Sequence, residues 1–172
     1  MEIREAVPAD WERIWPFLRD IVRAGETYTW PVDVTEEDAR AMWMAAGLPH
    51  RTVVAVENDG NDGDGGETVL GTAKMGPNHM GPGDHIANAS FMVAPEHGGK
   101  GVGRALGRHI VDQARADGFR SMQFNAVVST NTTAVRLWQS LGFEIVATLP
   151  EGFRHPAKGY VGLHIMFRSL VA

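Results

Sequence analysis

The chain has 172 residues, of which 44% are hydrophobic and 22% are charged, as is ordinary for a folded domain. These values exclude a collagenous or intrinsically disordered chain, and the length predicts one domain over residues 1–172. Sixteen Lys and Arg against 21 Asp and Glu give a formal charge of −5. We therefore expect no nucleic acid partner, because duplex-binding proteins need a basic face. The absence of Cys excludes a cysteine nucleophile and thiolate metal sites.

The start of the chain, MEIREAVPADWER, is charged where a signal peptide would be apolar. No apolar run approaches the ~20 residues of a membrane helix. These features predict a cytoplasmic protein with no membrane partner. The seven His include no HxxxH pair and no carboxylate cluster, so no metal site is predicted. The sequence leaves the oligomeric state open, with a homodimer as one candidate.

Two helices and three strands are predicted in the first half of the chain. Asp10 precedes apolar residues at helical spacing over 11–22, which predicts a helix capped by Asp10. Pro16 lies inside this helix and predicts a kink or a later start. Thr35, followed by three acidic residues, predicts the cap of a second helix. The strands are expected at 2–7, 51–57 and 68–75, with a hairpin loop rich in Gly and Asp at 58–67.

The second half of the chain has clearer boundaries. A strand is predicted at 85–94, followed by a glycine-rich loop and a helix from Val102. Asn131 predicts the cap of the next helix, which Gly142 ends. Further strands are expected at 121–128, around 143–149 and around 160–167. The order β-α-α-β-β-β-α-β-α-β-β therefore predicts an α/β fold with a mixed central sheet and helices on its faces.

The loop HGGKGVG (97–103) has the composition of an anion site. Its four glycines carry no Cβ to keep a ligand from the backbone, and a helix start offers free N–H groups and a positive dipole end. Lys100 and Arg104 add positive charge, so pyrophosphate is the ligand that this loop favours. The Walker pattern fails because no Ser or Thr follows Lys100, and the Rossmann pattern fails at Leu106. A tight turn that binds nothing is the alternative.

Two segments, VAPEHGGKGVGRAL and NTTAVRLWQSLGF, resemble the signature of the GNAT superfamily of acetyl-CoA-dependent N-acetyltransferases. That signature is V-x-P-x-x-[RQ]-G-x-G-x-[GA], followed by N-x-x-A-x-x-L-Y-x-x-x-G-F. The resemblance covers the whole chain, although residues 1–84 agree only in element order. It implies the acyl-CoA N-acyltransferase (GNAT) fold, in which a mixed, mostly antiparallel central sheet is flanked by helices, with acetyl-CoA as co-substrate and no metal.

The resemblance also implies where acetyl-CoA lies, in a V-shaped opening between the strand ending near Val93 and the strand at 121–128. Backbone groups of Phe91 and Val93 would pair with the pantetheine arm as though it were an added strand. Asn131 would lie beside the pantetheine or the sulfur. The amides of the loop would hold the pyrophosphate: Gly98, Gly99, Lys100, Gly101, Val102, Gly103 and Arg104.

The sequence departs from the family pattern at two positions. Gly98 stands where the family usually has Arg or Gln, which removes a side chain but leaves the amide. Trp138 stands where many members have the Tyr that protonates the departing thiolate. An indole N–H has no readily transferable proton, so Trp138 cannot be a general acid. A core role for Trp138 is the alternative.

A narrower resemblance links FNAVVSTNTTAVRLW, HIANASFMVAP and GETYTW to the fungal N-acetyltransferases that act on L-azetidine-2-carboxylate and related proline-like amino acids. It implies that Asn88 recognises substrate, while Asn125 and Asn131 serve cofactor binding and catalysis. Asn side chains offer both a donor and an acceptor, which suits an amine or a carboxylate. The alternative for Asn88 and Asn125 is that they satisfy buried strand ends.

The segment after the first helix is where such enzymes build the acceptor pocket. Tyr28 has an ionisable O–H, and Glu26 offers a carboxylate for an ammonium group; exposed loop residues without a role are the alternative. His85, just before the cleft strand, is the best histidine candidate for a relay base.

Without Cys, direct attack of an amine on the thioester in a ternary complex is the economical mechanism. The Val93 N–H would stabilise the oxyanion, and Asn131 would donate to the leaving thiolate. The expected acceptor is a small molecule, such as an amino acid or a proline-like compound. The alternatives are a protein or peptide N-acetyltransferase and a non-catalytic module that binds acyl-CoA.

Overall fold

The computed structural model describes residues 1–44, 47–58 and 66–171, so most of the predicted loop at 58–67 lies outside the described residues. The observed order of strands and helices is the predicted one, with short 3-10 turns added at Pro8–Asp10, Gly81–Gly83 and Pro95–His97. In chain order the elements are β1 (Glu2–Glu5), α1 (Trp11–Ala24), α2 (Glu36–Trp43), β2 (Arg51–Asn58), β3 (Glu67–Pro77), β4 (Ile86–Val93), α3 (Val102–Ala116), β5 (Ser121–Val128), α4 (Thr132–Ser140), β6 (Glu144–His155) and β7 (Gly159–Ser169).

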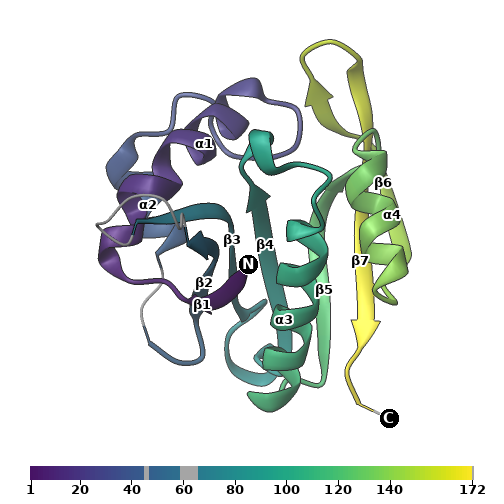
Figure 1. Cartoon of the computed structure of the whole chain (residues 1–172). Coiled ribbons are helices and arrows are strands. Elements are labelled where there is room, and N and C mark those ends of the chain that lie inside the picture. Colours follow the sequence, from purple (N-terminus) through teal and green to yellow (C-terminus); the bar gives the residue numbers. More distant parts are fainter. Residues whose placement is uncertain (45–46, 59–65, 172) are drawn as a thin grey trace.

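The strands form one seven-stranded sheet in the order β1-β2-β3-β4-β5-β7-β6 (Figure 1). β4 and β5 are parallel neighbours, and the other neighbouring strands of the described chain pair antiparallel. The predicted mixed, mostly antiparallel sheet is therefore confirmed. Because β4 is followed by α3 before β5 begins, the two strands run in the same direction and end at the same edge of the sheet.

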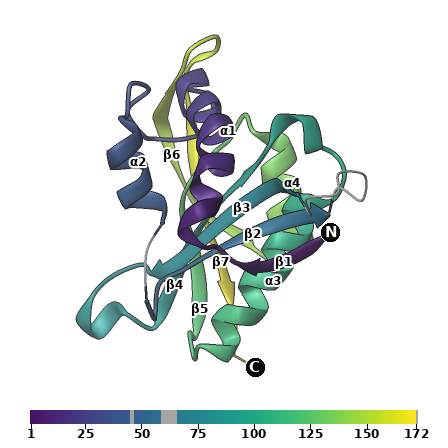
Figure 2. The same cartoon turned by 60° about the vertical axis from the view of Figure 1, so that its left-hand side comes forward.

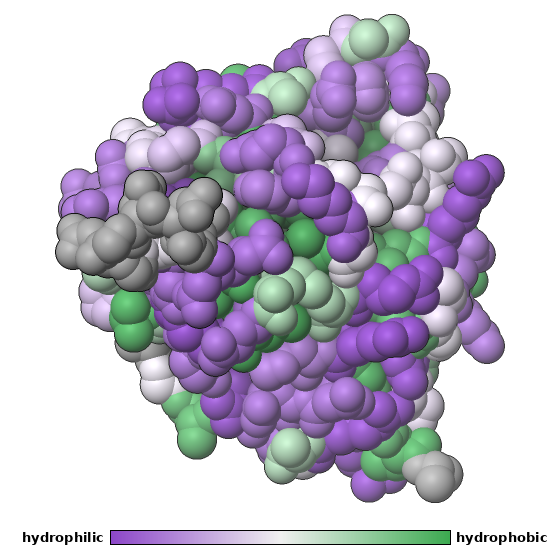
Figure 3. Space-filling model, viewed as in Figure 1, coloured by the Kyte–Doolittle hydropathy of each residue, from purple (hydrophilic) through white to green (hydrophobic). Residues whose placement is uncertain are grey.

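α1 and α2 lie on one face of the sheet, and α3 and α4 lie on the other (Figures 1 and 2). Leu18 of α1 and Trp43 of α2 belong to the core on one face, and Leu106 and Ile110 of α3 belong to the core on the other. All four are buried. The surface seen in Figure 3 is largely hydrophilic, with hydrophobic residues showing between polar ones.

The start of α1 differs from the prediction. The helix begins at Trp11 and contains Pro16, so the later start is wrong. Asp10 makes no side-chain cap to α1. Its carboxylate instead accepts from the Val7 N–H at 2.8 Å and pairs with Arg4 at 2.8 Å. Asp10 therefore ties the preceding 3-10 turn to β1.

The two predicted caps at the later helices are confirmed. Thr35 Oγ1 accepts from the Asp38 N–H at 3.1 Å at the start of α2. Asn131 Oδ1 accepts from the Ala134 N–H at 3.2 Å at the start of α4. Each cap satisfies one of the N–H groups that a helix start leaves without a partner.

Candidate active site

The sheet opens between β4 and β5. The two strands pair at Ile86 with Ser121 and at Ala87 with Met122, and the described pairing goes no further. A cavity of about 540 Å³ occupies the opening. The V-shaped opening that the family resemblance implies is therefore present.

The backbone of β4 turns toward this opening groups that are outside the described pairing with β5. The Ala94 N–H donates to Leu70 O at 3.0 Å, one position beyond the last pair of the antiparallel β3–β4 ladder, whose register has no shift. In such a ladder, every second residue directs its N–H and C=O to the partner strand, and the residues between direct theirs to the other edge. Phe91 and Val93 are the intervening residues. Their backbone groups face β5 where the described β4–β5 pairing has ended, as predicted for a strand that receives an extended ligand.

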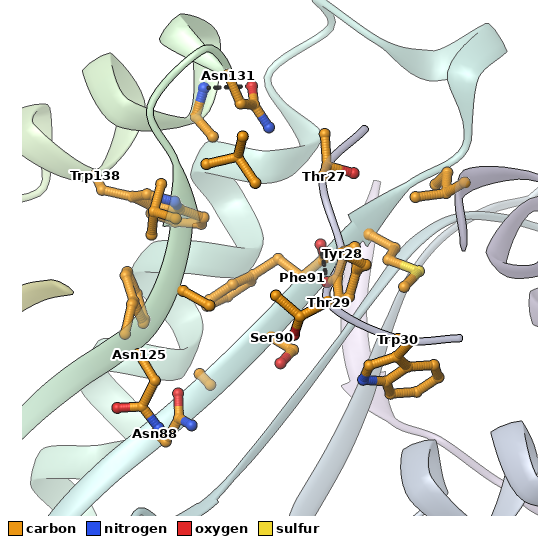
Figure 4. Close-up of a pocket in the computed structure, with 18 of the residues that line it drawn as sticks. Thr27, Tyr28, Thr29, Trp30, Asn88, Ser90, Phe91, Asn125, Asn131 and Trp138 are labelled. Atoms are coloured by element: carbon orange, nitrogen blue, oxygen red, sulfur yellow. Dashed lines mark hydrogen bonds between the residues drawn. The ribbon is translucent and has the colours of Figure 1, made fainter. Parts of the chain in front are cut away.

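The segment after α1 lines this opening. The Tyr28 hydroxyl donates to the Phe91 carbonyl oxygen at 2.8 Å, and Tyr28 lines the cavity (Figure 4). Burial raises the pKa of Tyr28 well above its usual value. Tyr28 is therefore a neutral donor at neutral pH that holds the segment to β4.

Three predicted amide side chains share the cavity wall: Asn88, Asn125 and Asn131. In Figure 4, Asn88 and Asn125 lie at one end of the cavity and Asn131 lies at the other. No hydrogen bond of the Asn88 side chain is found within the described ranges, so both of its amide atoms are open to a ligand. A ligand group that contacts Asn88 and a ligand group that contacts Asn131 therefore lie at opposite ends of the cavity.

Asn125 is already engaged on both sides. Its Nδ2 donates to Asn78 Oδ1 at 2.6 Å, and its Oδ1 accepts from Gln123 Nε2 at 2.8 Å. Its side chain is thus fixed within a row of three amides. Each atom keeps a second hydrogen-bonding site for a ligand. Asn78, which ends the β3 side of this row, was not predicted.

Asn131 has two functions available at once. Its Oδ1 caps α4, while no partner of its Nδ2 is found in the part of the chain that the structure describes. Because Asn131 lines the cavity, this N–H₂ group is a donor available to a bound ligand.

The glycine-rich loop has the geometry of an anion site. Gly99 and Gly101 adopt φ of +74° and +84°, a conformation that disfavours other residues, and Gly101 directly precedes α3. No side chain caps α3, so its first N–H groups are available to a ligand. These groups can hold a pyrophosphate. The predicted contact between the Gly98 amide and the pyrophosphate is not available, because the Gly98 N–H donates to Pro95 O at 3.1 Å.

Trp138 is a core residue that also lines the cavity. Its ring centre lies 4.6 Å from that of Phe91 and 5.0 Å from that of Phe124. These contacts fix the indole between β4 and β5 and support the packing interpretation of Trp138.

Two predicted residues are not brought to the site. Glu26 is exposed and is absent from the described lining, so it supplies no carboxylate there. His85 is also exposed and does not line the cavity. No general base is therefore identified among these candidates.

Sequence reasoning missed several lining residues. They are Thr27, Thr29, Trp30, Lys74 and Ser90. The available signal for Lys74 was a cation in TVLGTAKMGP, an otherwise uncharged stretch of β3, and Trp30 ends the GETYTW segment.

Within the described ranges, no group of three or more His, Cys, Asp or Glu could hold a metal ion. No described helix is long and apolar enough to span a membrane.

Comparison with known proteins gives the family. The acetyltransferase (GNAT) family matches residues 15–143. A GCN5-related N-acetyltransferase from Kribbella flavida is 56% identical, with a TM-score of 0.90 over 98% of this chain and 96% of that one. The yncA acetyltransferase of Salmonella typhimurium, solved with its cofactor acetyl-CoA, is 28% identical, with a TM-score of 0.79 over 100% of this chain and 95% of that one.

Two curated relatives cover most of the chain. The N-acetyltransferase aca1 of Schizosaccharomyces pombe is 29% identical over 87% of this chain and 75% of its own length. The L-amino acid N-acyltransferase MnaT of Escherichia coli is 31% identical over 88% of this chain and 84% of its own length. The fungal relative agrees with the narrower resemblance in the sequence. The chain belongs to the GNAT family and is an acetyl-CoA-dependent N-acetyltransferase.

Proposed function

We propose that this enzyme acetylates the amine of a small amino acid or proline-like compound. One observation carries the proposal: the segment after α1, tied to Phe91 of β4 through Tyr28, forms part of the wall of a single cavity of about 540 Å³. A cavity of this size suits a small ligand.

The relatives support the same class of acceptor. MnaT of Escherichia coli is named an L-amino acid N-acyltransferase, and it aligns with most of this chain. In the cavity, the Asn88 amide has both a donor and an acceptor for a polar acceptor molecule. We assign Asn88 and Tyr28 to the acceptor side.

Acetyl-CoA supplies an activated acetyl thioester. The first amides of α3, from Val102 to Arg104, bind its pyrophosphate, with Lys100 and Arg104 adding charge. The Phe91 N–H and the backbone groups of Val93, which face the opening beyond the β4–β5 pairing, align its pantetheine arm. Asn125, fixed by its neighbours, orients the reacting groups.

The reaction is a direct transfer in a ternary complex. The neutral amine forms a bond to the acetyl carbon, the carbon–sulfur bond breaks, and the amine proton passes to solvent. The Val93 N–H stabilises the developing oxyanion, as a donor already oriented toward the opening. The Asn131 N–H₂ group donates to the leaving sulfur, the role that Trp138 cannot fill as a proton donor.

An acetyl-CoA consumption screen tests the proposal. The panel contains free amino acids, imino acids, peptides with a free N-terminus and peptides with an internal lysine, with products identified by mass spectrometry. We expect N-acetylation of amino or imino acids. Acetylation confined to the peptides would replace the proposal with a protein or peptide N-acetyltransferase.

A further inference from the structure

Among the residues that the structure describes, the cavity wall carries one charged side chain. Lys74 is that cation, and no carboxylate lines the cavity within the same described ranges. Lys74 of β3 lies opposite Ser90 of β4 in the antiparallel pair, and both line the cavity. Opposite residues of such a pair have Cβ atoms about 5 Å apart. The Lys74 and Ser90 side chains therefore leave the sheet at the same part of the wall.

The Lys74 ammonium is held in place by α2 and by two indole rings. Nζ donates to Met42 O at 2.6 Å. It lies 5.5 Å from the ring centre of Trp30 and 5.6 Å from that of Trp43. The two indoles meet edge to face with centres 6.0 Å apart. A cation with a defined position thus lies against an aromatic wall.

This cation has no anionic partner in the described part of the chain. An ammonium has three N–H donors, of which the Met42 carbonyl uses one. Burial lowers the pKa of Lys74 because it removes water from the charged form without supplying a counter-ion. A ligand carboxylate would supply that missing counter-ion and accept the two free N–H groups.

We propose that Lys74 binds the carboxylate of the acceptor, with the Ser90 hydroxyl beside it, and thereby selects free amino acids over amines that lack an adjacent carboxylate. This inference rests on the proposed function, in which a small amine is the acceptor. Ser90 and Val93 are three residues apart on β4, or about 10 Å. In an α-amino acid one carbon separates the carboxylate from the amine, so the hydrogen bonds at the two ends and the acetyl group under attack complete that span when the carboxylate is at Lys74 and the amine is directed toward Val93. A lysine side chain within a peptide has no carboxylate to make this contact.

The test compares acids with their neutral counterparts. The values of kcat and KM are measured for L-proline and L-methionine, each beside its carboxamide, in the wild-type enzyme and in Lys74→Met, Lys74→Arg and Lys158→Met. Lys158 lies in the turn between β6 and β7, is exposed and does not line the cavity, so Lys158→Met is the matched control. Circular dichroism and urea unfolding report whether each variant is folded.

We expect the wild type to prefer an acid over its carboxamide by about 10- to 100-fold in kcat/KM, the range of a hydrogen bond to a charged group. Lys74→Met should raise KM for the acid by a similar factor and leave KM for the carboxamide nearly unchanged. Lys74→Arg should keep most of the preference, because it keeps the charge. Lys158→Met should match the wild type.

Three results separate failure of the inference from failure of the proposed function. Equal turnover of acids and carboxamides by the wild type overturns the role of Lys74 and leaves the small-amine acceptor standing. An equal loss of kcat/KM for the acid and the carboxamide in folded Lys74→Met also overturns that role. The packing of Lys74 against α2 and the two indoles would then be sufficient to explain the effect of the substitution. Turnover of peptides without any acid or carboxamide overturns the proposed function, and the inference with it.

Discussion

Asn131 offers a substitution that separates a structural role from a catalytic one. Its Oδ1 caps α4 through the Ala134 N–H, and its Nδ2 is available to the cavity. Asn131→Ala removes both groups. Loss of the cap should cost about 1 kcal/mol of unfolding free energy, or roughly 2–4 °C in Tm for a chain of this size. Loss of one transition-state donor should lower kcat by about 10²- to 10³-fold.

Asn131→Asp distinguishes the two functions, because Asp caps a helix as well as Asn but an ionised carboxylate cannot donate. We expect this variant to unfold at nearly the wild-type urea concentration and to lose at least as much kcat as Asn131→Ala. Thiol release is followed at saturating acetyl-CoA and amine.

Thr35→Ala is the matched control for the cap. Thr35 Oγ1 accepts from the Asp38 N–H at the start of α2, and Thr35 does not line the cavity. This variant should lose about 1 kcal/mol of stability and keep its kcat. A folded and fully active Asn131→Asp enzyme would refute the donor role of Asn131 and leave the departing thiolate without an identified partner.

Three further substitutions test the glycine-rich loop, the Trp138 indole and the Tyr28 hydroxyl. Gly101→Val should weaken acetyl-CoA binding at least tenfold by calorimetry. Gly118→Val is the control, because Gly118 has a similar φ of +87° at the other end of α3 and its substitution carries the same backbone strain without that loss. Equal affinities in the two folded variants would contradict the loop assignment. Trp138→Phe should keep kcat within tenfold, and a loss beyond a hundredfold at unchanged stability would show that the indole N–H takes part. Tyr28→Phe tests the raised pKa of Tyr28. Tyr28 ionises near pH 10 in the unfolded state but not in the folded state, so the stability of the wild type should fall above pH 10 relative to that of Tyr28→Phe. If the urea midpoints of the two proteins change in parallel from pH 8 to 11, the hydroxyl is not buried.

Local chemistry explains what the sequence predicted well. A helix cap depends on a few consecutive residues, so Thr35 and Asn131 could be assigned from short patterns. The loop around Gly101 is also local, because a strand, a glycine-rich turn and a helix start follow one another directly in the chain. The GNAT motifs then placed this loop and Asn131 on two sides of one opening.

Contacts between distant segments explain what was not predicted. Tyr28 reaches Phe91 across 63 positions, and Lys74 reaches Met42 across 32. Neither contact leaves a pattern in a short window of sequence. The prediction for Glu26 was wrong for the same reason. Glu26 is exposed, whereas Tyr28, two residues further along the segment, lines the cavity.

The packing of α3 on α4 connects the two halves of the site. Both helices begin at the sheet edge where β4 and β5 end, so their positive ends lie at the same opening (Figure 1). A Cβ added at Gly107 of α3 would lie 2.6 Å from Leu141 Cδ1 and 3.0 Å from Trp138 Cζ3. Gly107 therefore admits the indole that this chain carries where many family members have Tyr. The departure from the family pattern at Trp138 is accommodated in α3, where the absence of a Cβ at Gly107 lets the two helices approach closely.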